Sequence, residues 1–483
     1  MRGGKRLNAG RKLSEQKKVG TKIYLTPEVI NAVENFSIGK SFSEKCSHII
    51  EEYIKEERKE KSKTIRFVDL FAGMGGIRLG FTQAIKRLGY NPKCVFSSEL
   101  KKYAIQVYKN YYDNEQVYGD ITKIEASFIP EFDFLLAGFP CQPFSFAGKG
   151  LGFDDTRGTL FFDIERILRE KKPYGFLLEN VEGLVKHDKG KTLSIIISHL
   201  ENLGYTVSWK LLDSQFFGLA QSRKRVYIVG TKDGKAVSLE NFIQSNSKLG
   251  DVLERGLPTV DSRFTKCLFK HYNVDEIVGK SIKDKRGGKD NIHSWDIGLK
   301  GNTTDLEKEL LNRLLTERRK KHWAKEIGIK WMDGMPLTQR QIATFFENEE
   351  LEAILHSLVA KGYLKIEHPK DLVNGIRIAD TTKEPGYNIV AGKLSFEFSQ
   401  ILDPNRLAPT LVAMDVSKLG VIDNAGIRRL TVREGCRLCG YPEDYDMSMI
   451  NEKEAFDLLG NTVCVPVISA VAERLLRCYL RLE

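Results

Sequence analysis

The feature that most constrains this chain is a largely apolar run from Phe132 to Ala137, which ends at Gly138 and leads directly into Pro140-Cys141-Gln142-Pro143. Such a run is typical of a parallel strand that is buried on both faces. Open α/β sheets bind their ligands just beyond the carboxyl ends of such strands. Prolines on both sides of Cys141 restrict the backbone and so orient the thiol. The alternative is a buried, inert cysteine that happens to follow a strand.

The charge of the chain favours a polyanionic partner, since the formal net charge is +11 and the pI is about 9.0. A merely solubilising surface is the alternative. The 483 residues correspond to about two to four domains. No apolar stretch matches a membrane span, and the amino terminus lacks the apolar core of a signal peptide, so we expect a cytoplasmic protein. Eight scattered cysteines are typical of reduced thiols, and Cys436-x-x-Cys439 has no second ligand pair, so we expect no metal.

Residues 1–62 have the pattern of a small DNA-binding module. A basic, glycine-containing arm precedes Thr21 to Leu25, where apolar and polar residues alternate as in a strand. Thr26-Pro27-Glu28 and the capping box Ser41-x-x-Glu44 then start two helices, and a charged linker follows from Glu56 to Lys63. This order resembles the ribbon-helix-helix repressors, whose paired strands enter the major groove and would place Lys22 and Tyr24 against bases. A helical hairpin that only caps the next domain is the alternative.

A second unit begins with a buried strand from Thr64 to Leu70 and the turn Phe71-Ala-Gly-Met-Gly-Gly76. Glycines after a first strand let the backbone approach a nucleotide or nucleoside closely. The next strand ends in Glu99, which is suited to ribose hydroxyls. In Gly119-Asp120-Ile121, the carboxylate suits an exocyclic amine and the aliphatic side chain suits a ring. Together these residues predict a site for an adenosine.

Five motifs in one order resemble the DNA (cytosine-5) methyltransferases of restriction–modification systems. They are Phe67-Val-Asp-Leu-Phe-Ala-Gly-Met-Gly-Gly76, Gly138-Phe-Pro-Cys-Gln-Pro-Phe-Ser145, Leu178-Glu-Asn-Val181, Gln221-x-Arg-x-Arg225 and Leu459-Gly-Asn-Thr-Val463. The resemblance implies an α/β doubly wound sheet that uses S-adenosylmethionine, split into residues 63–245 and 427–483. Residues 246–426 would be an inserted target recognition domain. Ala220 stands where relatives often have proline, and we expect no loss of activity from it.

The resemblance also implies the roles of individual residues. Cys141 would add to C6 of cytosine, and Glu179 would donate a proton at N3, with its pKa raised by the apolar run before it. Arg223 and Arg225 would contact the base carbonyl and the catalytic loop, with a phosphate contact as the alternative. The implied cofactor-binding residues are Phe71, Gly73, Met74, Gly75, Gly76, Glu99, Leu100, Asp120, Ile121, Pro140 and Asn461. The implied DNA-binding residues are Gln142, Ser145, Arg157, Thr410 and Leu411, beside Lys22 and Tyr24.

The predicted substrate is therefore double-stranded DNA, from which the target base must be flipped. A transfer-RNA cytosine-5 methyltransferase and a DNA-binding repressor with an inactive catalytic domain are the alternatives. The stretch from Arg286 to Lys321 resembles enzymes that read palindromes beginning GG and ending CC. We expect a monomer on the target DNA or a dimer through residues 1–62, and a cognate restriction endonuclease as the functional partner.

Overall fold

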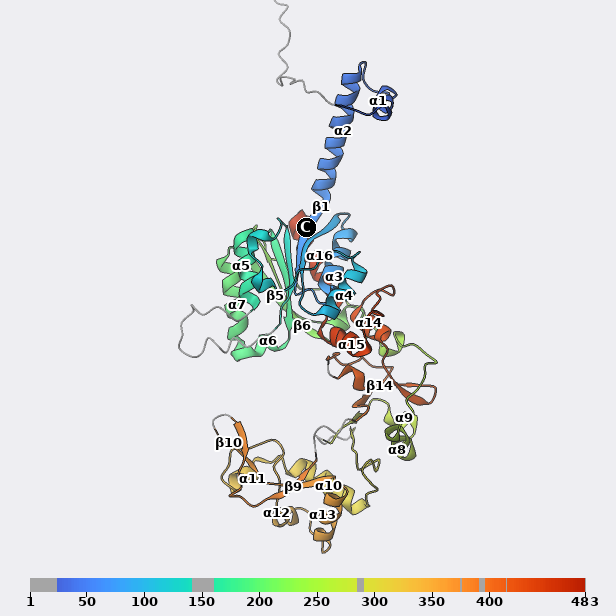
Figure 1. Ribbon diagram of the computed structural model, residues 1–483. Helices are drawn as coiled ribbons and strands as arrows, with labels where there is room; N and C mark the ends of the chain where they lie inside the picture. Colours follow the sequence, from blue (N-terminus) through green and yellow to red (C-terminus); the bar gives the residue numbers. More distant parts are fainter. Residues whose placement is uncertain are drawn as a thin grey trace, which may run out of the picture. The chain divides into compact units, whose positions relative to one another are not determined.

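The computed structural model describes residues 24–140, 160–284, 291–373, 376–390, 396–413 and 415–482, with the side chains of residues 54–62 left out of the description. The chain divides into two compact units at the boundary between Thr64 and Ile65. Figure 1 labels the helices and strands of both units.

The first unit contains the helices α1 (Pro27–Glu34) and α2 (Phe42–Lys63). Pro27 begins α1 as expected, but the preceding Thr26 makes no side-chain capping bond. At α2 the backbone N–H of Glu44 donates to Ser41 Oγ over 3.3 Å. The charged linker expected from residue 56 is wrong, because the helix continues to Lys63. Glutamate, lysine and arginine are strong helix formers, and no glycine or proline interrupts the run.

The second unit is organised around a six-stranded sheet with the order β2-β1-β3-β4-β6-β5. Its strands are β1 (Thr64–Leu70), β2 (Asn91–Ser98), β3 (Phe134–Gly138), β4 (Gly175–Val181), β5 (Thr206–Asp213) and β6 (Lys224–Thr231). β3 is parallel to β1 and β4, whereas β6 is antiparallel to β4 and β5. The sheet is therefore mixed, with parallel and antiparallel pairs, and the fold is of the α/β class. The expected buried strand after residue 132 is confirmed as β3, whose first four residues are fully buried.

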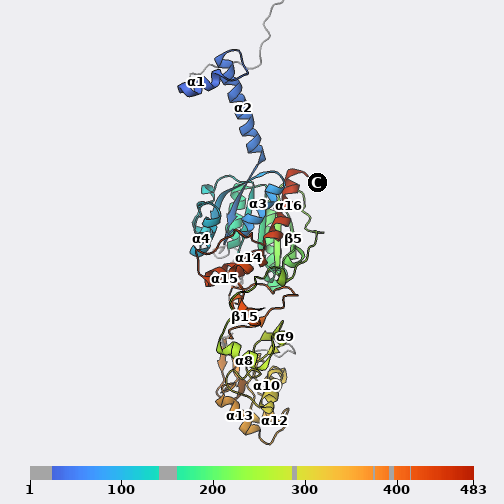
Figure 2. The same ribbon diagram turned by 90° about the vertical axis from the view of Figure 1, so that its right-hand side faces the viewer.

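Helices cover both faces of this sheet (Figures 1 and 2). On one face, α3 (Gly76–Arg87) and α16 (Val465–Leu480) pack against alternate strand residues such as Phe134 and Leu136. On the other, α5 (Leu160–Lys171) and α7 (Lys191–Asn202) pack against Leu135 and Ala137. Gly80 permits the close approach of α3 to α16, since a Cβ there would lie 2.7 Å from Ile468. The final helix of the chain thus packs on the sheet face that also buries Ile65 and Phe67 of the first strand.

The carboxyl-terminal helices correct one expectation. Residues 452–480 are the stretch, within the described residues, that is long and apolar enough to match a membrane span. They form two helices, α15 (Glu452–Asn461) and α16, and most of their side chains are buried in the core. A core helix of a soluble domain has the same composition as a membrane span when all its faces are covered.

Residues between β6 and α14 (Val432–Cys439) form smaller layers. A five-stranded sheet has the order β15-β14-β13-β7-β8. Its strands are β7 (Ser281–Ile282), β8 (Asn291–Ile292), β13 (Gln400–Ile401), β14 (Leu419–Asp423) and β15 (Gly426–Arg429). Two hairpin-like pairs join β9 (Leu364–Glu367) to β12 (Gly386–Ile389) and β10 (Lys370–Val373) to β11 (Ile376–Ala379). The helices here are α8 (Arg263–His271), α9 (Val274–Ile277), α10 (Asp305–Glu317), α11 (Lys321–Glu326), α12 (Gln339–Ala343) and α13 (Leu351–Ala360). In α13 the apolar residues recur at helical spacing, and Leu351, Ile354, Leu355 and Leu358 are buried.

Shorter elements complete the second unit. They are α4 (Lys102–Tyr111), α6 (Gly183–Lys186) and the 3-10 helices η1 (Ile121–Lys123), η2 (Ala126–Phe128), η4 (His187–Gly190), η5 (Ser214–Phe216), η6 (Leu249–Asp251) and η7 (Val416–Lys418). Of these, η1 contributes Ile121 to a cavity at the carboxyl ends of the strands, and Lys101, which immediately precedes α4, lines the same cavity.

Candidate functional site

A cavity of about 630 Å³ lies at the carboxyl ends of β1 to β4. It is lined by the turn after β1, the end of β2, residues 119–121, the ends of β3 and β4, two side chains before and within β6, and residues around 458–463. The structure therefore brings together Glu179, Arg223, Arg225 and every predicted cofactor residue except one, which is Gly75. Its volume is in the range of small-molecule sites.

The turn between β1 and α3 is held by its glycines and by Glu99. Phe71, Gly73 and Gly75 all have positive φ angles, of 54°, 54° and 79°. At Gly73 a Cβ would meet nothing within 4 Å, so the space beside this backbone is open. Glu99 Oε2 accepts the N–H of Gly73 over 2.7 Å. The turn is thus fixed to the end of β2 with an open face toward the cavity.

The carboxylates of Glu99 and Asp120 both accept hydrogen bonds from backbone N–H groups. Glu99 Oε1 accepts the N–H groups of Leu100 and Lys101 over 2.8 and 2.9 Å. Asp120 caps η1, and its Oδ1 accepts from the hydroxyl and the N–H of Thr122. These bonds lower the pKa of Asp120, which keeps the carboxylate ionised. Each carboxylate therefore has a fixed position, and lone pairs remain for a ligand.

Apolar side chains form the remaining wall near these carboxylates. Ile121 is buried, whereas Leu100 is 64% exposed beside the cavity. A pocket with acidic groups on one side and aliphatic groups on the other fits a ribosyl purine that carries a positive charge. The residues present therefore fit S-adenosylmethionine. Within the described residues, no group of three or more His, Cys, Asp or Glu side chains could hold a metal ion.

Glu179 and Arg225 form an ion pair at the opposite end of the cavity. Glu179 lies beside Gly138 in the β3–β4 register and opposite Tyr227 in β6. Arg225 is two residues before Tyr227, so it is on the same face of the sheet, and its Nε is 3.1 Å from Glu179 Oε1. Burial raises the pKa of Glu179 although Arg225 and Arg223 oppose the shift. The pKa of Arg225 is lowered by its own burial and by the charge of Arg223.

Asn180 connects this pair to the segment that carries the predicted cysteine. Its Nδ2 donates to the carbonyl of Phe139 over 2.9 Å, and its Oδ1 accepts the N–H of Val181. Cys141 itself lies outside the described residues, as do Gln142, Ser145, Arg157 and Lys22.

Arg223 has a different environment from Arg225. Its guanidinium is buried and donates to the carbonyls of Leu411, Gly460 and Thr462, the first two over 2.9 Å. The family resemblance implied a contact with the base carbonyl or the catalytic loop, with a phosphate contact as the alternative. In the structure, the guanidinium N–H groups of Arg223 instead donate to backbone carbonyls of residues that follow it by 188 to 239 positions in the chain. Arg223 lines the cavity, but its terminal nitrogens bond to backbone carbonyls of the protein. Its role in the structure is therefore to join the segments that form the cavity wall.

Gln221 and the Thr410–Leu411 pair form a second junction of the same kind. Gln221 Nε2 donates to the carbonyl of Leu438 over 2.9 Å, and its Oε1 accepts the N–H of Leu411 over 3.0 Å. The hydroxyl of Thr410 donates to the carbonyl of Ser222 over 2.7 Å. The predicted DNA contact of Leu411 is corrected, because its side chain is completely buried in the core and both of its backbone polar groups are bonded within the protein.

Several cavity residues were missed in the sequence. Lys101 lines the cavity, and its Nζ donates to Asp457 Oδ2 over 2.7 Å. Asn461 donates to the same aspartate, Asp457, which follows Lys101 by 356 residues in the chain. The predicted cofactor contact of Asn461 remains a prediction. No local pattern marks such a pair, because its partners meet only in the folded chain.

Comparisons with known proteins agree on one family. The model of the C-5 cytosine-specific DNA methylases matches residues 65–477. The chain is 59% identical over 419 residues to the Type II methyltransferase M.NlaIV of Neisseria lactamica, which covers 85% of this chain and 99% of that protein. It is 44% identical to the Type II methyltransferase M.BanI of Aneurinibacillus aneurinilyticus, covering 85% and 95%. The solved structure of Entamoeba histolytica methyltransferase EhMeth is 14% identical, with a TM-score of 0.48 over 87% of this chain and 99% of that one.

The different environments of the two arginines predict different costs of substitution. Arg223→Gln should lower the free energy of unfolding by at least about 2 kcal/mol, because buried carbonyls lose their donors. Arg225→Gln should cost less, since Glu179 can take up a proton when its partner is removed. Urea unfolding of both variants at pH 7 measures the difference. Equal losses of unfolding free energy in the two variants would contradict the conclusion that Arg223, and not Arg225, is the arginine with the structural role.

Proposed function

The chain belongs to the C-5 cytosine-specific DNA methylases, and from that premise we propose which of its residues carry the reaction. It is a DNA (cytosine-5) methyltransferase of a restriction–modification system, and S-adenosylmethionine is its methyl donor. The observation that carries the residue assignment is the buried Glu179–Arg225 pair beside the strand end that leads to Cys141.

Cytosine C5 is a poor nucleophile, so the ring must first be activated. We assign this to the Cys141 thiolate, which adds to C6 and makes C5 electron-rich. The negative charge that develops in the ring is neutralised at N3 by the proton of Glu179. C5 then bonds to the methyl carbon, whose bond to the donor sulfur breaks, so that S-adenosylhomocysteine is the leaving group. A base removes the C5 proton, the Cys141 thiolate leaves C6, and the N3 proton returns to Glu179. The raised pKa of Glu179 supports its role, because burial increases the fraction of protonated carboxyl at neutral pH.

Arg225 would orient this carboxyl and contact the base. Its Nε already lies 3.1 Å from Glu179 Oε1, and one of its terminal nitrogens donates to the carbonyl of Lys224 over 2.8 Å. Glu179 is only 8% exposed, so a base stacked in a duplex cannot reach it. The buried acid therefore supports flipping of the target cytosine into the cavity.

The methyl donor would occupy the other end of the same cavity. Glu99 would accept from the ribose hydroxyls, Asp120 from the exocyclic amine, and Leu100 and Ile121 would cover the adenine ring. The open backbone of Gly73 would let the ligand approach the turn closely. When bound, S-adenosylmethionine supplies the methyl group. These residues would bind and orient it beside the flipped base.

Recognition of the target sequence would fall to residues 246–426. Arginine and lysine in this region suit guanine edges and phosphates. The stretch from Arg286 to Lys321 resembles enzymes that read palindromes beginning GG and ending CC, and this resemblance supports such a target. A transfer-RNA substrate is not favoured, because the relatives that cover most of the chain are Type II methyltransferases.

Bisulfite sequencing of DNA from cells that express the protein tests the reaction and its residues. Wild-type protein should leave one cytosine per half-site unconverted within a short recurrent sequence. Cys141→Ser should abolish this signal, and Glu179→Gln should lower the rate on purified duplex by about 10²- to 10⁴-fold, as expected for a lost general acid. Cys267→Ser, a half-buried cysteine of the recognition region, is the matched control and should methylate normally. Normal methylation by Cys141→Ser would refute the covalent mechanism.

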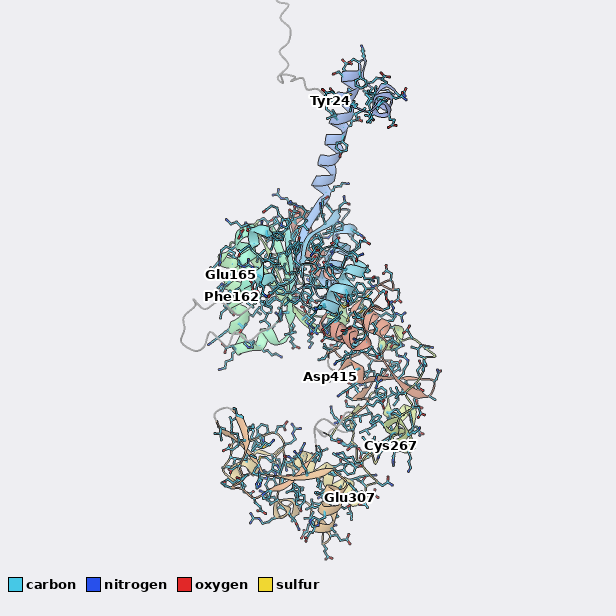
Figure 3. The ribbon with its side chains drawn as sticks, viewed as in Figure 1. Tyr24, Phe162, Glu165, Cys267, Glu307 and Asp415 are labelled. Atoms are coloured by element: carbon cyan, nitrogen blue, oxygen red, sulfur yellow. The ribbon has the colours of Figure 1, made fainter. Side chains whose placement is uncertain are left out.

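We further propose that residues 1–62 form a DNA-binding module that dimerises. Among its described residues only Val33 is a buried hydrophobic side chain. Large apolar side chains are exposed instead, namely Tyr24, Val29, Ile30, Ile38, Phe42, Ile50 and Tyr53. So small a unit cannot be stable without covering such a surface, and a second copy would cover it by the same faces. Tyr24 is 93% exposed and would be free to contact bases (Figure 3).

A modification enzyme must be produced in balance with its nuclease, which makes its own promoter the natural target of this module. Deleting residues 1–60 should leave methylation specificity unchanged and remove sequence-specific binding to DNA upstream of the gene. A gel-shift assay at moderate salt compares full-length and truncated protein on upstream and scrambled DNA. Equal retardation of both DNAs by the full-length protein would leave only a non-specific basic arm, which binds through phosphates.

A further inference from the structure

Five tyrosines gather behind the glycine turn, on the side away from the cavity. They are Tyr108, Tyr111 and Tyr112 from α4 and its end, and Tyr441 and Tyr445 from the segment after α14. The ring centroids of Tyr111 and Tyr445 are 4.5 Å apart, and those of Tyr108 and Tyr112 are 4.6 Å apart. This cluster joins the first and last parts of the catalytic fold, because Tyr445 lies 371 residues after the turn.

Two of these tyrosines bond directly to the turn. Tyr112 donates its hydroxyl to the carbonyl of Gly75 over 2.9 Å, and Tyr445 donates to the carbonyl of Met74. The Tyr112 ring is also in close contact with the turn, since a Cβ at Gly75 would lie 2.5 Å from Cε2. Burial raises the pKa of both hydroxyls far above the ordinary value, so both remain protonated donors.

The orientation of these carbonyls determines what the turn presents to the cavity. In a trans peptide the C=O and the following N–H point in opposite directions. Because the carbonyl of Gly75 faces Tyr112, the N–H of Gly76 faces the other way, and Gly76 lines the cavity. Gly76 is the first residue of α3, so the helix itself does not use this N–H. The adjacent N–H of Gly75 closes the turn on the carbonyl of Ala72 over 2.8 Å.

Tyr112 is itself held rigidly. The guanidinium carbon of Arg78 lies 3.7 Å from the centre of the Tyr112 ring. Arg78 is fixed in turn by two bonds to Glu115, of 2.6 and 2.8 Å, and by one to the hydroxyl of Tyr108. A side chain that is stacked, hydrogen-bonded and buried has lost its conformational freedom before any ligand arrives. Because the turn is already ordered, binding of a ligand does not have to include the entropy cost of ordering it.

We propose that Tyr112 and Tyr445 are positioning residues for S-adenosylmethionine, which they serve without touching it by holding the carbonyls of Met74 and Gly75 away from the cavity. This inference rests on the proposal that the cavity binds the methyl donor. The loss of either hydroxyl would free one peptide plane of the turn. Affinity for the cofactor would fall while the chemistry at the flipped base stayed the same.

Tyr112→Phe and Tyr445→Phe each remove one hydroxyl and keep the ring. Each should raise the Kd for S-adenosylmethionine by roughly 3- to 10-fold, the factor that corresponds to one net hydrogen bond. The KM for S-adenosylmethionine should rise in parallel, while kcat at saturating cofactor and the KM for DNA stay near the wild-type values. Isothermal titration calorimetry on the full-length protein without DNA measures the Kd directly.

Tyr205→Phe is the matched control. It removes the same kind of bond, from a buried tyrosine hydroxyl to the carbonyl of Pro173 over 3.0 Å, and it does not line the cavity. It should lose stability to urea much as the two test variants do, yet bind the cofactor normally. Equal weakening in all three variants would mean that only general stability had changed, and would overturn the proposal.

Glu99→Ala separates this proposal from the assignment of the cavity. If Glu99→Ala binds the cofactor as tightly as the wild type, the cavity assignment fails. If Glu99→Ala weakens binding but Tyr112→Phe and Tyr445→Phe do not, the cavity stands and the positioning role is refuted. Should a phenylalanine variant fold poorly, hydrogen exchange of residues 73–77 in the folded fraction gives the second measurement. Exchange there faster than in Tyr205→Phe supports the proposal, and equal exchange overturns it.

Discussion

The buried guanidinium of Arg223 is the interaction on which the rest of this site depends. Its donors bond to carbonyls at residues 411, 460 and 462, which belong to segments far along the chain from β6. Gln221 does the same for Leu411 and Leu438. The cavity is lined by Asn461 and its neighbours as well as by the ends of the first strands, and the ion pair of Glu179 requires Arg225 in register on β6. A buried charge is costly to leave unpaired, so these segments are held firmly together.

The strand order of the sheet determines which part of the cavity each segment forms. Parallel pairing of β1, β3 and β4 brings their carboxyl ends to one edge, where the glycine turn and Glu179 line one cavity. We propose that the turn holds the methyl donor and that Glu179 contacts the base. The antiparallel strand β6 then adds two arginines with unlike roles, because Arg225 lies on the cavity face beside Glu179 while Arg223 precedes the strand and is buried. Tyrosines from α4 and from the segment after α14 support the turn from behind.

Local patterns in the sequence predicted the parts of the site that are local in the fold. The strand–glycine–helix order predicted the turn after β1, and the acid after the next strand predicted Glu99, since both depend on a few adjacent residues. Leu411 and Arg223 were misjudged because their burial is decided by partners about 190 to 240 residues away. The charged run before residue 64 was taken as a linker, although its helix propensity extends α2. Tyr445 left no signal at all, for its partner is a carbonyl at the other end of the chain.

The central claim is that the cysteine after β3 attacks the base that Glu179 protonates. A duplex with fluorine at C5 of the target cytosine tests it directly, because fluorine cannot leave as the C5 proton does and the sulfur stays attached to C6. Incubation with the protein and S-adenosylmethionine, followed by proteolysis and mass spectrometry, identifies the attached residue. The account predicts a stable, methylated adduct on Cys141. An adduct on another cysteine, or methyl transfer with no trapped protein, would contradict it.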